Sequence, residues 1–594
     1  MKKLFLLAFI LISTFAHGQL KCCFNYAPQT DPNYDTVHFE NTSASLHYVY
    51  DSLDLVGGWA DGIITWPYGY TGGSYKIFQM GRSASDPHLV RRTEVASGSG
   101  STVHARLPAF IDTGMDSSSL YELRIYATRP GTNSLGDPYP ALNRSYPAEW
   151  RTMPTAVTAG NADIILDFAT ASQATINAEF DDTWGSVVTT RRRVLCKNTN
   201  ASARFINIFY KNYLSTKPYQ VGFENCSMTV SSGNTFHMGP NEGVIIDGMN
   251  GNLTKQLTLT HSNSSEVLFV QNYDGSHAGK WIWVGGVIID GAGGGTGLAV
   301  QSSFGTFNET NFSSKGYIFS DMLITNTSNE ASYFGGCCSH IPQYFPFTHI
   351  YIFRIRADDI GNEGMQIGNA KYGEIFNNVW TNTGTSDTPA QNYNHQFNSN
   401  CDAIAMYRNW GLTSRENFET VQGDIGGNVE YFANFSRTTK ASGSSATFWH
   451  FSESLRFSSV IHNSNWNTWV KETSLVYAIY NDDSPMTTVV YMNANGNALV
   501  SNTTTQASYN NGFDNSNTIM NNKAYSSTGG GVFLSPGTNN FSPASLTSSL
   551  FTFTTNSTAE SMYIHPNMLD DYYGYRRDSN SAAGAYSGFN LVQH

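Results

Sequence analysis

The chain has 594 residues, with 34 Lys or Arg against 46 Asp or Glu, so its formal net charge is −12. An acidic chain with only 13% charged residues argues against a nucleic-acid-binding protein, whose affinity depends on a basic surface. The hydrophobic fraction of 40% is enough for a buried core and too high for a disordered chain.

The N-terminus has the pattern of a secretory signal peptide. Lys2 and Lys3 precede an apolar run over 4–15, and the small residues Ala16 and Gly18 follow, which predicts a signal peptide at residues 1–18. This run is about a dozen residues long, whereas a membrane-spanning helix needs about 20. We therefore expect a secreted or extracellular protein with no membrane span.

Seven cysteines remain in a chain that this leader sends to an oxidising compartment. This setting favours disulfides, but the spacing leaves the pairing open, and an odd count leaves at least one thiol free or paired between chains. The cysteine spacing does not resemble a zinc ribbon. The cysteines are Cys22, Cys23, Cys196, Cys226, Cys337, Cys338 and Cys401.

Residues 19–130 have the pattern of a small antiparallel β-sandwich. Short alternating runs, cut by Gly, Ser and Asp, are typical of such domains, and examples lie at 63–66, 74–78 and 120–127. The order of these runs resembles a fibronectin type III domain, which implies a spacer or adhesion module. The Pro-rich stretch within 131–160 predicts a linker to a second domain.

Residues 161–546 contain internal repeats. The string Gly-Val-Ile-Ile-Asp-Gly occurs at 243–248 and again at 286–291, an offset that predicts two coils of about 21 or 22 residues. A second phrase, at 318–326, returns at 375–382, 457–463 and 519–526. Each copy is a short β-prone run closed by Asn, Ser or Gly.

Such repeats predict a β-solenoid. One coil exposes apolar faces above and below, and only another coil stacked at about 4.8 Å buries them and pairs the backbone amides. Asn suits the corners of such a coil, because it tolerates left-handed backbone geometry and can bond to the same Asn in the next coil. Long helical patterns are missing, which disfavours a TIM barrel or a Rossmann sheet.

At this point the chain resembles the secreted right-handed parallel β-helix repeat proteins of the pectate-lyase-like superfamily. The residues that carry the likeness lie at 361–369, 375–378 and 382–384, and the phrases at 570–578 and 583–586 resemble the segment that closes many of these proteins. The resemblance implies an all-β fold, with a right-handed parallel β-helix over 161–546 and a closing segment over 547–594. It leaves the function open, because the superfamily includes lyases, hydrolases, tailspikes and noncatalytic adhesins.

The densest polar cluster of the chain surrounds Arg356. A polysaccharide lyase needs a cation or calcium to neutralise a uronate and a base to take its proton, and a glycoside hydrolase needs two carboxyl groups. The candidate catalytic residues are Arg356, Asp358, Glu363 and Lys371. Calcium is the one metal that the cluster suggests, with Asp358, Asp359 and Glu363 as its ligands.

Aromatic residues form the second candidate site. The segment 331–348 is too long and aromatic for a tight corner, and exposed rings stack on sugar faces. The candidate substrate-binding residues are His340, Tyr344, Phe345, Trp380 and Trp410. We therefore expect a protein that binds extracellular or cell-surface glycan along one flank, with a lyase or hydrolase acting on an acidic polysaccharide, or a structural adhesin or filament, as alternatives.

Overall fold

The computed structural model describes most of the chain between residues 48 and 533. Residues 156–198, 205–302, 314–335, 347–397 and 401–414 are described almost without gaps. Before them the structure describes the strands of a first domain, and between 415 and 533 it describes mainly strands. The expected signal peptide at 1–18 and the expected closing segment at 547–594 lie outside the described residues.

The first domain is an antiparallel sandwich of two sheets. One sheet has the order β1-β2-β5 and the other has the order β4-β3-β6-β7. Side chains such as Ile77, Leu107 and Leu123 are fully buried in a shared core. The strands are β1 (Tyr48–Val49), β2 (Gly58–Ile63), β3 (Thr71–Arg82), β4 (Val90–Ser99), β5 (Thr102–Leu107), β6 (Leu120–Thr128) and β7 (Leu142–Arg151).

The last strand of the sandwich corrects the expected linker. Strand β7 lies inside 131–160 and pairs with β6 along most of its length. Proline normally marks breaks, but β7 is an edge strand, and an edge strand tolerates Pro147 because part of its backbone needs no ladder partner. Composition alone therefore placed this domain boundary too early.

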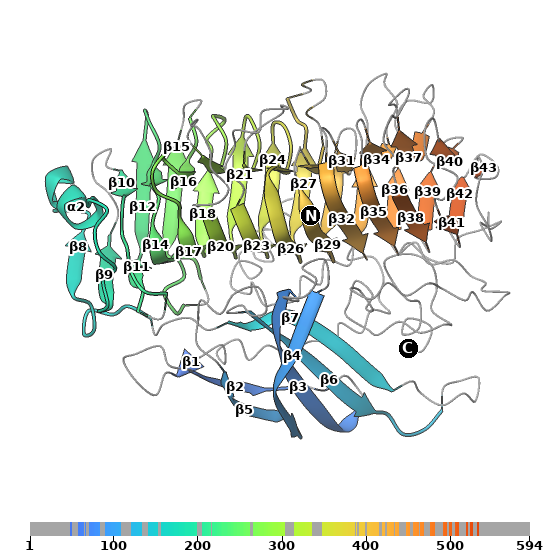
Figure 1. Cartoon of the computed structure of the whole chain (residues 1–594), viewed down its shortest axis with the longest axis horizontal. Helices are drawn as coiled ribbons and strands as arrows, with labels where there is room; N and C mark the ends of the chain where they lie inside the picture. The colour runs from blue at the N-terminus through green and yellow to red at the C-terminus, as the bar shows by residue number, and fades with distance from the viewer. Residues whose placement is uncertain are drawn as a thin grey trace, which may run out of the picture.

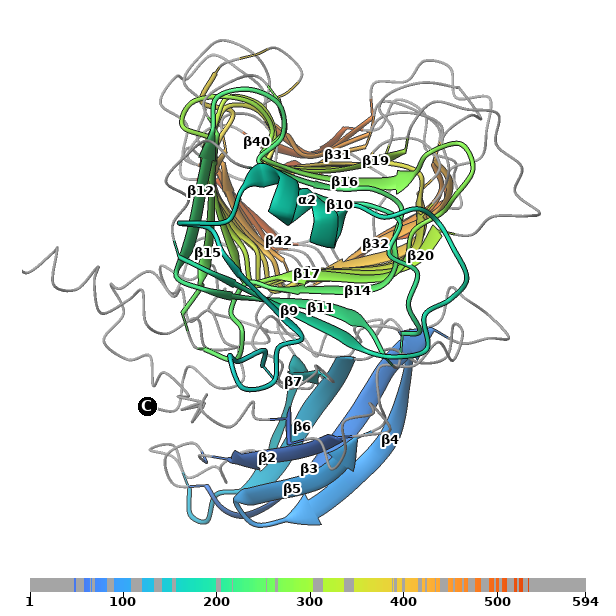
Figure 2. The same cartoon turned by 90° about the vertical axis from the view of Figure 1, so that its left-hand side faces the viewer.

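The second domain is a parallel β-solenoid with three sheets, as Figures 1 and 2 show. We call them sheet I, sheet II and sheet III in the order in which each coil passes through them. Sheet I has 13 strands, sheet II has 11 and sheet III has 12, and every solenoid strand pairs in parallel with its counterparts in neighbouring coils. The all-β parallel β-helix predicted from the sequence is confirmed.

The strand bounds of the solenoid are as follows. Sheet I contains β8 (Ile164–Asp167), β9 (Arg192–Lys197), β11 (Tyr219–Glu224), β14 (Glu242–Asp247), β17 (Lys280–Gly285), β20 (Ser314–Ser320), β23 (Phe347–Phe353), β26 (Ala370–Phe376), β29 (Asp402–Tyr407), β32 (Ile425–Phe432), β35 (Leu455–Ile461), β38 (Tyr491–Asn495) and β41 (Thr518–Met520). Sheet II contains β12 (Cys226–Val230), β15 (Leu257–His261), β18 (Val287–Asp290), β21 (Leu323–Thr327), β24 (Arg356–Ile360), β27 (Val379–Thr383), β30 (Trp410–Ser414), β33 (Phe435–Thr438), β36 (Ser464–Asn467), β39 (Ala498–Ser501) and β42 (Lys523–Ser526). Sheet III contains β10 (Ile206–Ile208), β13 (Phe236–Met238), β16 (Leu268–Tyr273), β19 (Leu298–Ser302), β22 (Ser332–Phe334), β25 (Met365–Ile367), β28 (His395–Phe397), β31 (Glu419–Val421), β34 (Thr447–Phe451), β37 (Val476–Asn481), β40 (Thr505–Tyr509) and β43 (Val532–Phe533).

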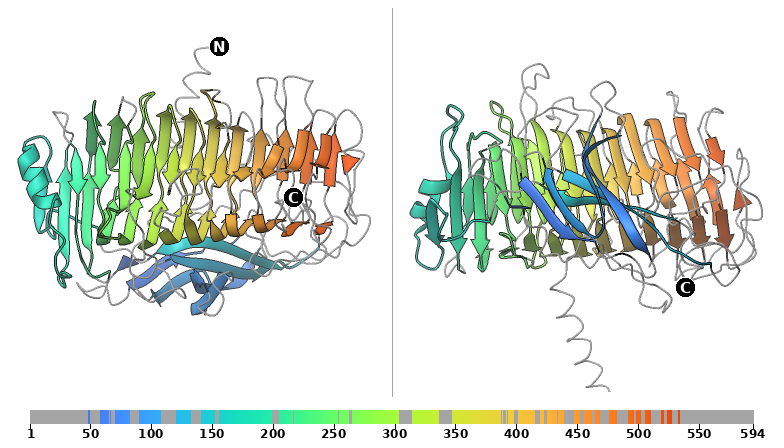
Figure 3. Two further views of the ribbon diagram at one scale, coloured as in Figure 1. Left: turned by 45° about the horizontal axis from the view of Figure 1, so that its top comes forward. Right: turned by 90° about the horizontal axis from the view of Figure 1, so that it is seen from below.

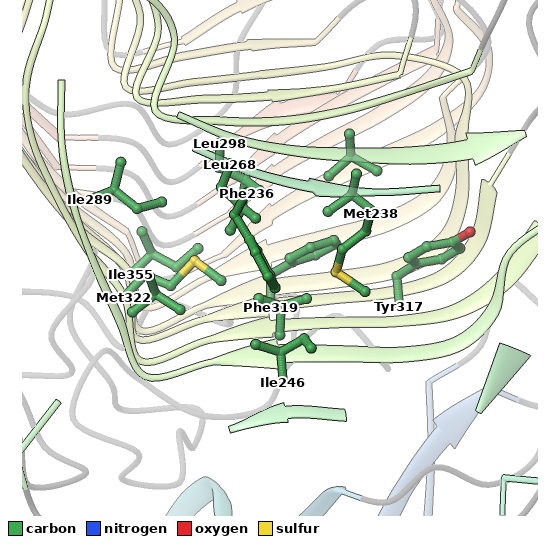
Figure 4. Close-up of a cluster of buried hydrophobic side chains, with 14 of the residues drawn as sticks. Phe236, Met238, Ile246, Leu268, Ile289, Leu298, Tyr317, Phe319, Met322 and Ile355 are labelled. Atoms are coloured by element: carbon green, nitrogen blue, oxygen red, sulfur yellow. The ribbon is translucent and has the colours of Figure 1, made fainter. Parts of the chain in front are cut away.

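The interior of the solenoid is filled by columns of apolar side chains from all three sheets. In sheet I, Ile246, Val284 and Phe319 occupy equivalent positions in consecutive coils, and all three are fully buried. Figure 4 shows such side chains pointing into the interior from different sheets. Phe319 of sheet I contacts Phe334 of sheet III, with ring centroids 5.3 Å apart. Alternate strand positions point inward, so each coil covers the apolar face of the next.

A ladder of buried asparagines follows the corner between sheets I and II. The Asn378 side-chain amide donates to Oδ1 of Asn409 at 3.0 Å, and the Asn409 amide donates to Oδ1 of Asn434 at 3.0 Å. Next to the ladder, Asn377 has a left-handed backbone with φ of 55°. Both roles predicted for corner asparagines are therefore confirmed.

Of the two repeats found in the sequence, one marks equivalent positions in the solenoid and the other does not. The phrases at 318–326, 375–382 and 519–526 each run from a strand of sheet I into a strand of sheet II, as expected of true repeats. The phrase at 457–463 lies in the equivalent place and ends at the residue before β36 of sheet II. The strings at 243–248 and 286–291 are not equivalent, because the first forms β14 in sheet I and the second forms β18 in sheet II. Coil length also varies more than predicted, since Val244 pairs with Ile282 but Ile352 pairs with Ile375.

The sandwich packs against the outer face of sheet I, on the side of the rod (Figures 1 and 3). Met80 and Leu120 of the sandwich join an apolar cluster that includes Trp283 and Phe353 of the solenoid. Beside the cluster, Arg92 of the sandwich forms hydrogen bonds of 3.2 and 2.8 Å to the two carboxylate oxygens of Glu374. Outward residues of sheet I are thus buried by the other domain.

A short helix covers one end of the solenoid. Helix α2 (Gln173–Phe180) begins after Ser172, whose side chain accepts a hydrogen bond from the Thr175 amide, and it buries Ile176 and Phe180 in the solenoid core. Figure 2 views the rod from this end, with α2 lying across it. With eight residues, α2 is too short to cross a membrane, and no longer apolar helix lies in the described part of the chain.

Three of the seven cysteines lie among the described residues. Cys196, Cys226 and Cys401 are buried, and their sulfurs are reduced. Burial raises the pKa of the Cys226 thiol to about 12. These three cysteines therefore form no disulfide in this structure, and the other four lie outside the described residues.

Candidate functional site

The four predicted catalytic residues lie on different sheets of the solenoid. Arg356 and Asp358 belong to β24 in sheet II, and Lys371 belongs to β26 in sheet I. Glu363 lies at the corner between sheets II and III, with no exposed surface. The sequence brought these residues together because they are close along the chain, whereas one coil distributes them over three faces.

Glu363 is nevertheless unusual. Neither of its carboxylate oxygens has a hydrogen-bond partner among the described residues. Burial, reinforced by the nearby charge of Glu330, raises the pKa of Glu363 to about 8. A carboxyl group in this environment is protonated at neutral pH, and it is enclosed rather than offered to a substrate.

The three predicted calcium ligands do not form a metal site. Asp358 accepts hydrogen bonds from the Thr381 hydroxyl at 2.5 Å and from the Asn382 amide at 3.0 Å. Asp359 is exposed and Glu363 is buried at a different corner. Within the described part of the chain, no group of three or more His, Cys, Asp or Glu side chains is arranged to hold a metal ion.

The basic residues near Arg356 are engaged in structure. The Arg354 guanidinium pairs with Asp321 of the preceding coil at 2.7 and 3.2 Å, and both side chains are buried. Burial lowers the pKa of nearby Lys255 to about 8, which Arg354 and Arg356 reinforce and the charge of Asp321 opposes. The positive charge of Arg354 is therefore neutralised by Asp321 within the protein and is not offered to a ligand.

Two of the five predicted sugar-binding residues are buried. Trp380 is 1% exposed and packs on the His395 ring with a centroid distance of 3.8 Å. Trp410 is 5% exposed, so neither indole is available to stack on a sugar. His340, Tyr344 and Phe345 lie outside the described residues.

A different group of rings lies on the outside of the solenoid, near the end covered by α2. We call it the aromatic strip, and its six side chains are all partly exposed. It crosses from the outer face of sheet III to the corner between sheets III and I. Its members are Trp184, Phe209, Tyr210, His237, Phe269 and His277.

Each ring of the strip contacts the next. Phe269 and His237 have a centroid distance of 4.8 Å, and His237 and Phe209 are also 4.8 Å apart. Phe209 continues to Tyr210 at 5.9 Å, and Tyr210 continues to His277 at 5.6 Å. The chain of contacts ends where the His277 ring stacks on the Trp184 indole at 4.7 Å and 28°.

Asp274 ties the polar end of the strip together. Its carboxylate accepts hydrogen bonds of 2.8 Å from the backbone amides of Ser276 and His277, and it lies 3.2 Å from Nδ1 of the His277 ring. Burial would raise the pKa of Asp274, but these hydrogen bonds and one from Tyr210 outweigh it and lower that pKa. Burial, followed by the hydrogen bond to Asp274, raises the pKa of the Tyr210 phenol.

Local sequence explains how distant segments meet here. Tyr210 follows β10 and Asp274 follows β16, so one intervening coil separates them. That coil turns with only Gly239–Asn241 between β13 and β14, and a Cβ at Gly239 would collide with the Phe209 ring. Trp184 is held by the next residue, because the carbonyl of Gly185 accepts a hydrogen bond of 2.8 Å from the Asn212 side chain.

His237 adds an apolar surface rather than a charge. Burial lowers the pKa of His237 to about 4, so the ring is neutral at neutral pH. The strip therefore offers ring faces along most of its length and a carboxylate, a phenol and an imidazole at one end. Ring faces with a few polar groups are what carbohydrate surfaces require.

Sequence reasoning missed every residue of the strip. Trp184, Tyr210 and Asp274 are far apart in the chain, and only the register of three coils brings them together. The Asp-Gly-Ser-His string at 274–277 was the available signal, since Asp at the start of a turn binds the following amides.

Comparisons with known proteins assign no activity. No family model matches the chain, and no curated protein matches it. Among solved structures, tailspike protein 2 of Escherichia coli O157:H7 bacteriophage CAB120 is similar at 10% identity and a TM-score of 0.34, over 58% of this chain and 45% of the tailspike. This chain thus matches less than half of the tailspike's length.

Two other similar structures are enzymes that act on polysaccharides. Pectate lyase Pel9A is 12% identical with a TM-score of 0.30, over 72% of this chain and 97% of that chain. The catalytic unit of a GH87 α-1,3-glucanase from Streptomyces thermodiastaticus is 9% identical with a TM-score of 0.24, over 85% and 91% of the two chains. At these values the likenesses carry no functional argument.

Proposed function

We propose that this protein binds polysaccharide through the aromatic strip on the outside of its solenoid. One observation carries the proposal, namely the unbroken series of six partly exposed rings that ends at the Asp274–His277 pair. Flat apolar rings pack on the C–H faces of sugars, and polar groups at their margin bond to hydroxyls. The rings belong to segments that the solenoid backbone holds in fixed register, so little conformational entropy is lost on binding.

We further propose that binding takes place outside the cell, with extracellular or cell-surface glycan as the partner. The signal-peptide pattern at 1–18 supports export. Cleavage after Gly18 can be tested by sequencing the N-terminus of the protein recovered from the culture medium. Retention of the full chain inside cells would contradict it.

The binding proposal is tested by affinity electrophoresis and titration calorimetry against a panel of polysaccharides. Trp184→Ala and Phe269→Ala remove rings at the two ends of the strip, and each should weaken binding roughly 10-fold or more. Tyr372→Ala is the matched control, because Tyr372 is a partly exposed ring several coils away that contacts His349. Equal loss in the control and the strip variants would refute the proposal.

A second candidate function is catalysis on a polysaccharide, as a lyase or a glycoside hydrolase. The observation that favours it is the 3.2 Å contact of Asp274 with His277 Nδ1, because an aspartate that fixes the imidazole tautomer leaves Nε2 able to take a proton. Absorbance of unsaturated products and a reducing-sugar assay on the same panel distinguish catalysis from binding. Turnover that His277→Ala abolishes would establish the enzyme, and binding without turnover would establish the noncatalytic protein.

We propose that the first domain is a fibronectin type III-like module. Its seven strands, divided into sheets of three and four, support this assignment. Packed against sheet I, such a module stiffens the rod instead of acting as a free spacer. A structural adhesin or filament remains the alternative for the whole chain, and lack of binding to the glycan panel would favour it.

A further inference from the structure

We infer that the aromatic strip selects amino-bearing sugars over uncharged ones and excludes uronates. This inference rests on the proposed glycan-binding function and adds the charge of the ligand to it. It opposes the expectation, drawn from the sequence, that an enzyme of this fold would act on an acidic polysaccharide.

The charge of the strip comes from two carboxylates. Asp274 lies within the strip, in contact with His277 and Tyr210. Asp181, exposed at the end of α2, is close enough for its charge to act on the Tyr210 phenol. In the part of the chain that the structure describes, neither carboxylate forms an ion pair with a lysine or arginine.

The two lysines near the strip, Lys211 and Lys280, pair with other carboxylates. The Lys211 side chain is 6% exposed, and its ammonium donates to the Glu179 carbonyl at 2.7 Å and lies 3.4 Å from Asp182. Lys280 lies 3.9 Å from Glu242 on the preceding coil. A ligand on the strip therefore meets two carboxylates that pair with no lysine or arginine of the described residues.

Two interactions with the strip stabilise an ammonium group on a bound sugar. It is attracted by Asp274 and Asp181, and it is also attracted by the π faces of Trp184 and Tyr210. A uronate carboxylate is repelled by the same groups. An uncharged sugar retains the stacking alone, which places its affinity between the two.

The experiment uses the full mature chain and three soluble oligosaccharides of equal length. These are a β-1,4-glucosamine oligomer, its N-acetylated counterpart and an oligogalacturonate, titrated calorimetrically at a pH near 6.5. We expect the glucosamine oligomer to bind roughly 10-fold more tightly than the N-acetylated one, and the oligogalacturonate not to bind. Raising the salt from about 50 to about 500 mM should remove most of this difference.

Two variants assign the selectivity to the strip. Asp181→Asn should weaken the glucosamine oligomer roughly 3-fold and leave the N-acetylated oligomer unchanged. Asp274→Asn, which keeps an oxygen to accept the amides of the turn, should weaken it more. Glu94→Gln, the same charge change on an exposed residue of the sandwich, is the control and should change neither affinity.

The outcomes separate the two claims. Binding of the oligogalacturonate as tight as that of the glucosamine oligomer would overturn this inference and leave glycan binding intact. Equal loss for charged and neutral oligomers in Asp181→Asn would also overturn it. Failure of all three sugars to bind, extended to the wider panel, would overturn the proposed function and this inference together.

Discussion

Glu363 should make the stability of the solenoid depend on pH in an unusual direction. Its folded-state pKa is about 8 and its ordinary value is 4.5, so the folded protein holds a proton that the unfolded chain releases. Below about pH 4.5 the group is protonated in both states and contributes no pH dependence. As the pH rises from 4.5 through 8, stability falls, and above 8 the full cost is present.

The magnitude follows from the pKa difference. A shift of about 3.5 pKa units corresponds to about 5 kcal/mol, at 1.36 kcal/mol for each unit. Glu363→Gln replaces the carboxyl with a neutral group of the same shape and removes this dependence. We compare the unfolding free energy of the variant with that of the wild type and take their difference at pH 4 as the reference. Relative to that reference, the variant should be more stable by about 3 kcal/mol at pH 7 and by about 5 kcal/mol at pH 9.

The assay is urea unfolding of both proteins at several pH values, followed by circular dichroism. Comparing each difference with the one at pH 4 cancels any fixed cost of the buried amide. Glu330→Gln is the companion variant, since removing its charge should lower the pKa of Glu363 and reduce the slope only in part. Parallel pH profiles for wild type and Glu363→Gln between pH 5 and 9 would refute the reasoning.

Three further predictions concern the ladder and the domain interface. Asn409→Ala should lower the unfolding free energy by about 2–4 kcal/mol in urea titrations, because it leaves the Ile375 carbonyl and the Asn378 amide buried without their partner. Glu374→Ala removes the carboxylate that accepts two hydrogen bonds from Arg92 and leaves Arg92 paired with Glu122 alone, which should cost about 2–3 kcal/mol by calorimetry. Lys76→Ala, in an exposed ion pair, should leave the midpoint unchanged. Burial opposes ionisation of Glu122, but Arg124 and Arg92 lower its pKa to about 2, so its contribution is present above about pH 4.5 and should be lost as the pH falls to 2. Small-angle scattering should show the domains separating over that range in wild type, whereas Glu122→Gln should show weaker association at neutral pH already.

The fold was predictable because solenoid stacking leaves a direct trace in the sequence. The phrases around Ile318 and Ile375 each contain a strand of sheet I, a corner and a strand of sheet II. The string shared by 243–248 and 286–291 misled, because strands of sheets I and II both need inward aliphatic residues and a polar corner. A single string therefore fits either sheet, and only backbone pairing identifies which one it occupies.

The site was not predictable by the same means. Proximity along the chain grouped Arg356, Asp358, Glu363 and Lys371, yet one coil of this solenoid spreads such a segment over three faces. Trp184, Tyr210 and Asp274 meet because residues at like positions of nearby coils are neighbours in space. Coil lengths that vary from 38 residues, between Val244 and Ile282, to 23, between Ile352 and Ile375, conceal those positions in the sequence.

The corner between sheets I and II has a consequence for how this protein can diversify. After every strand of sheet I from β17 to β41, only one or two residues precede the next strand of sheet II, whereas the other two corners admit insertions such as 384–394. The short, asparagine-lined corner keeps successive coils in register, whereas the other two corners tolerate insertions and deletions. Changes in the loops at those two corners can therefore create new binding surfaces without altering the solenoid. Exchanging the 274–279 segment between related solenoids should transfer ligand preference and leave the fold unchanged.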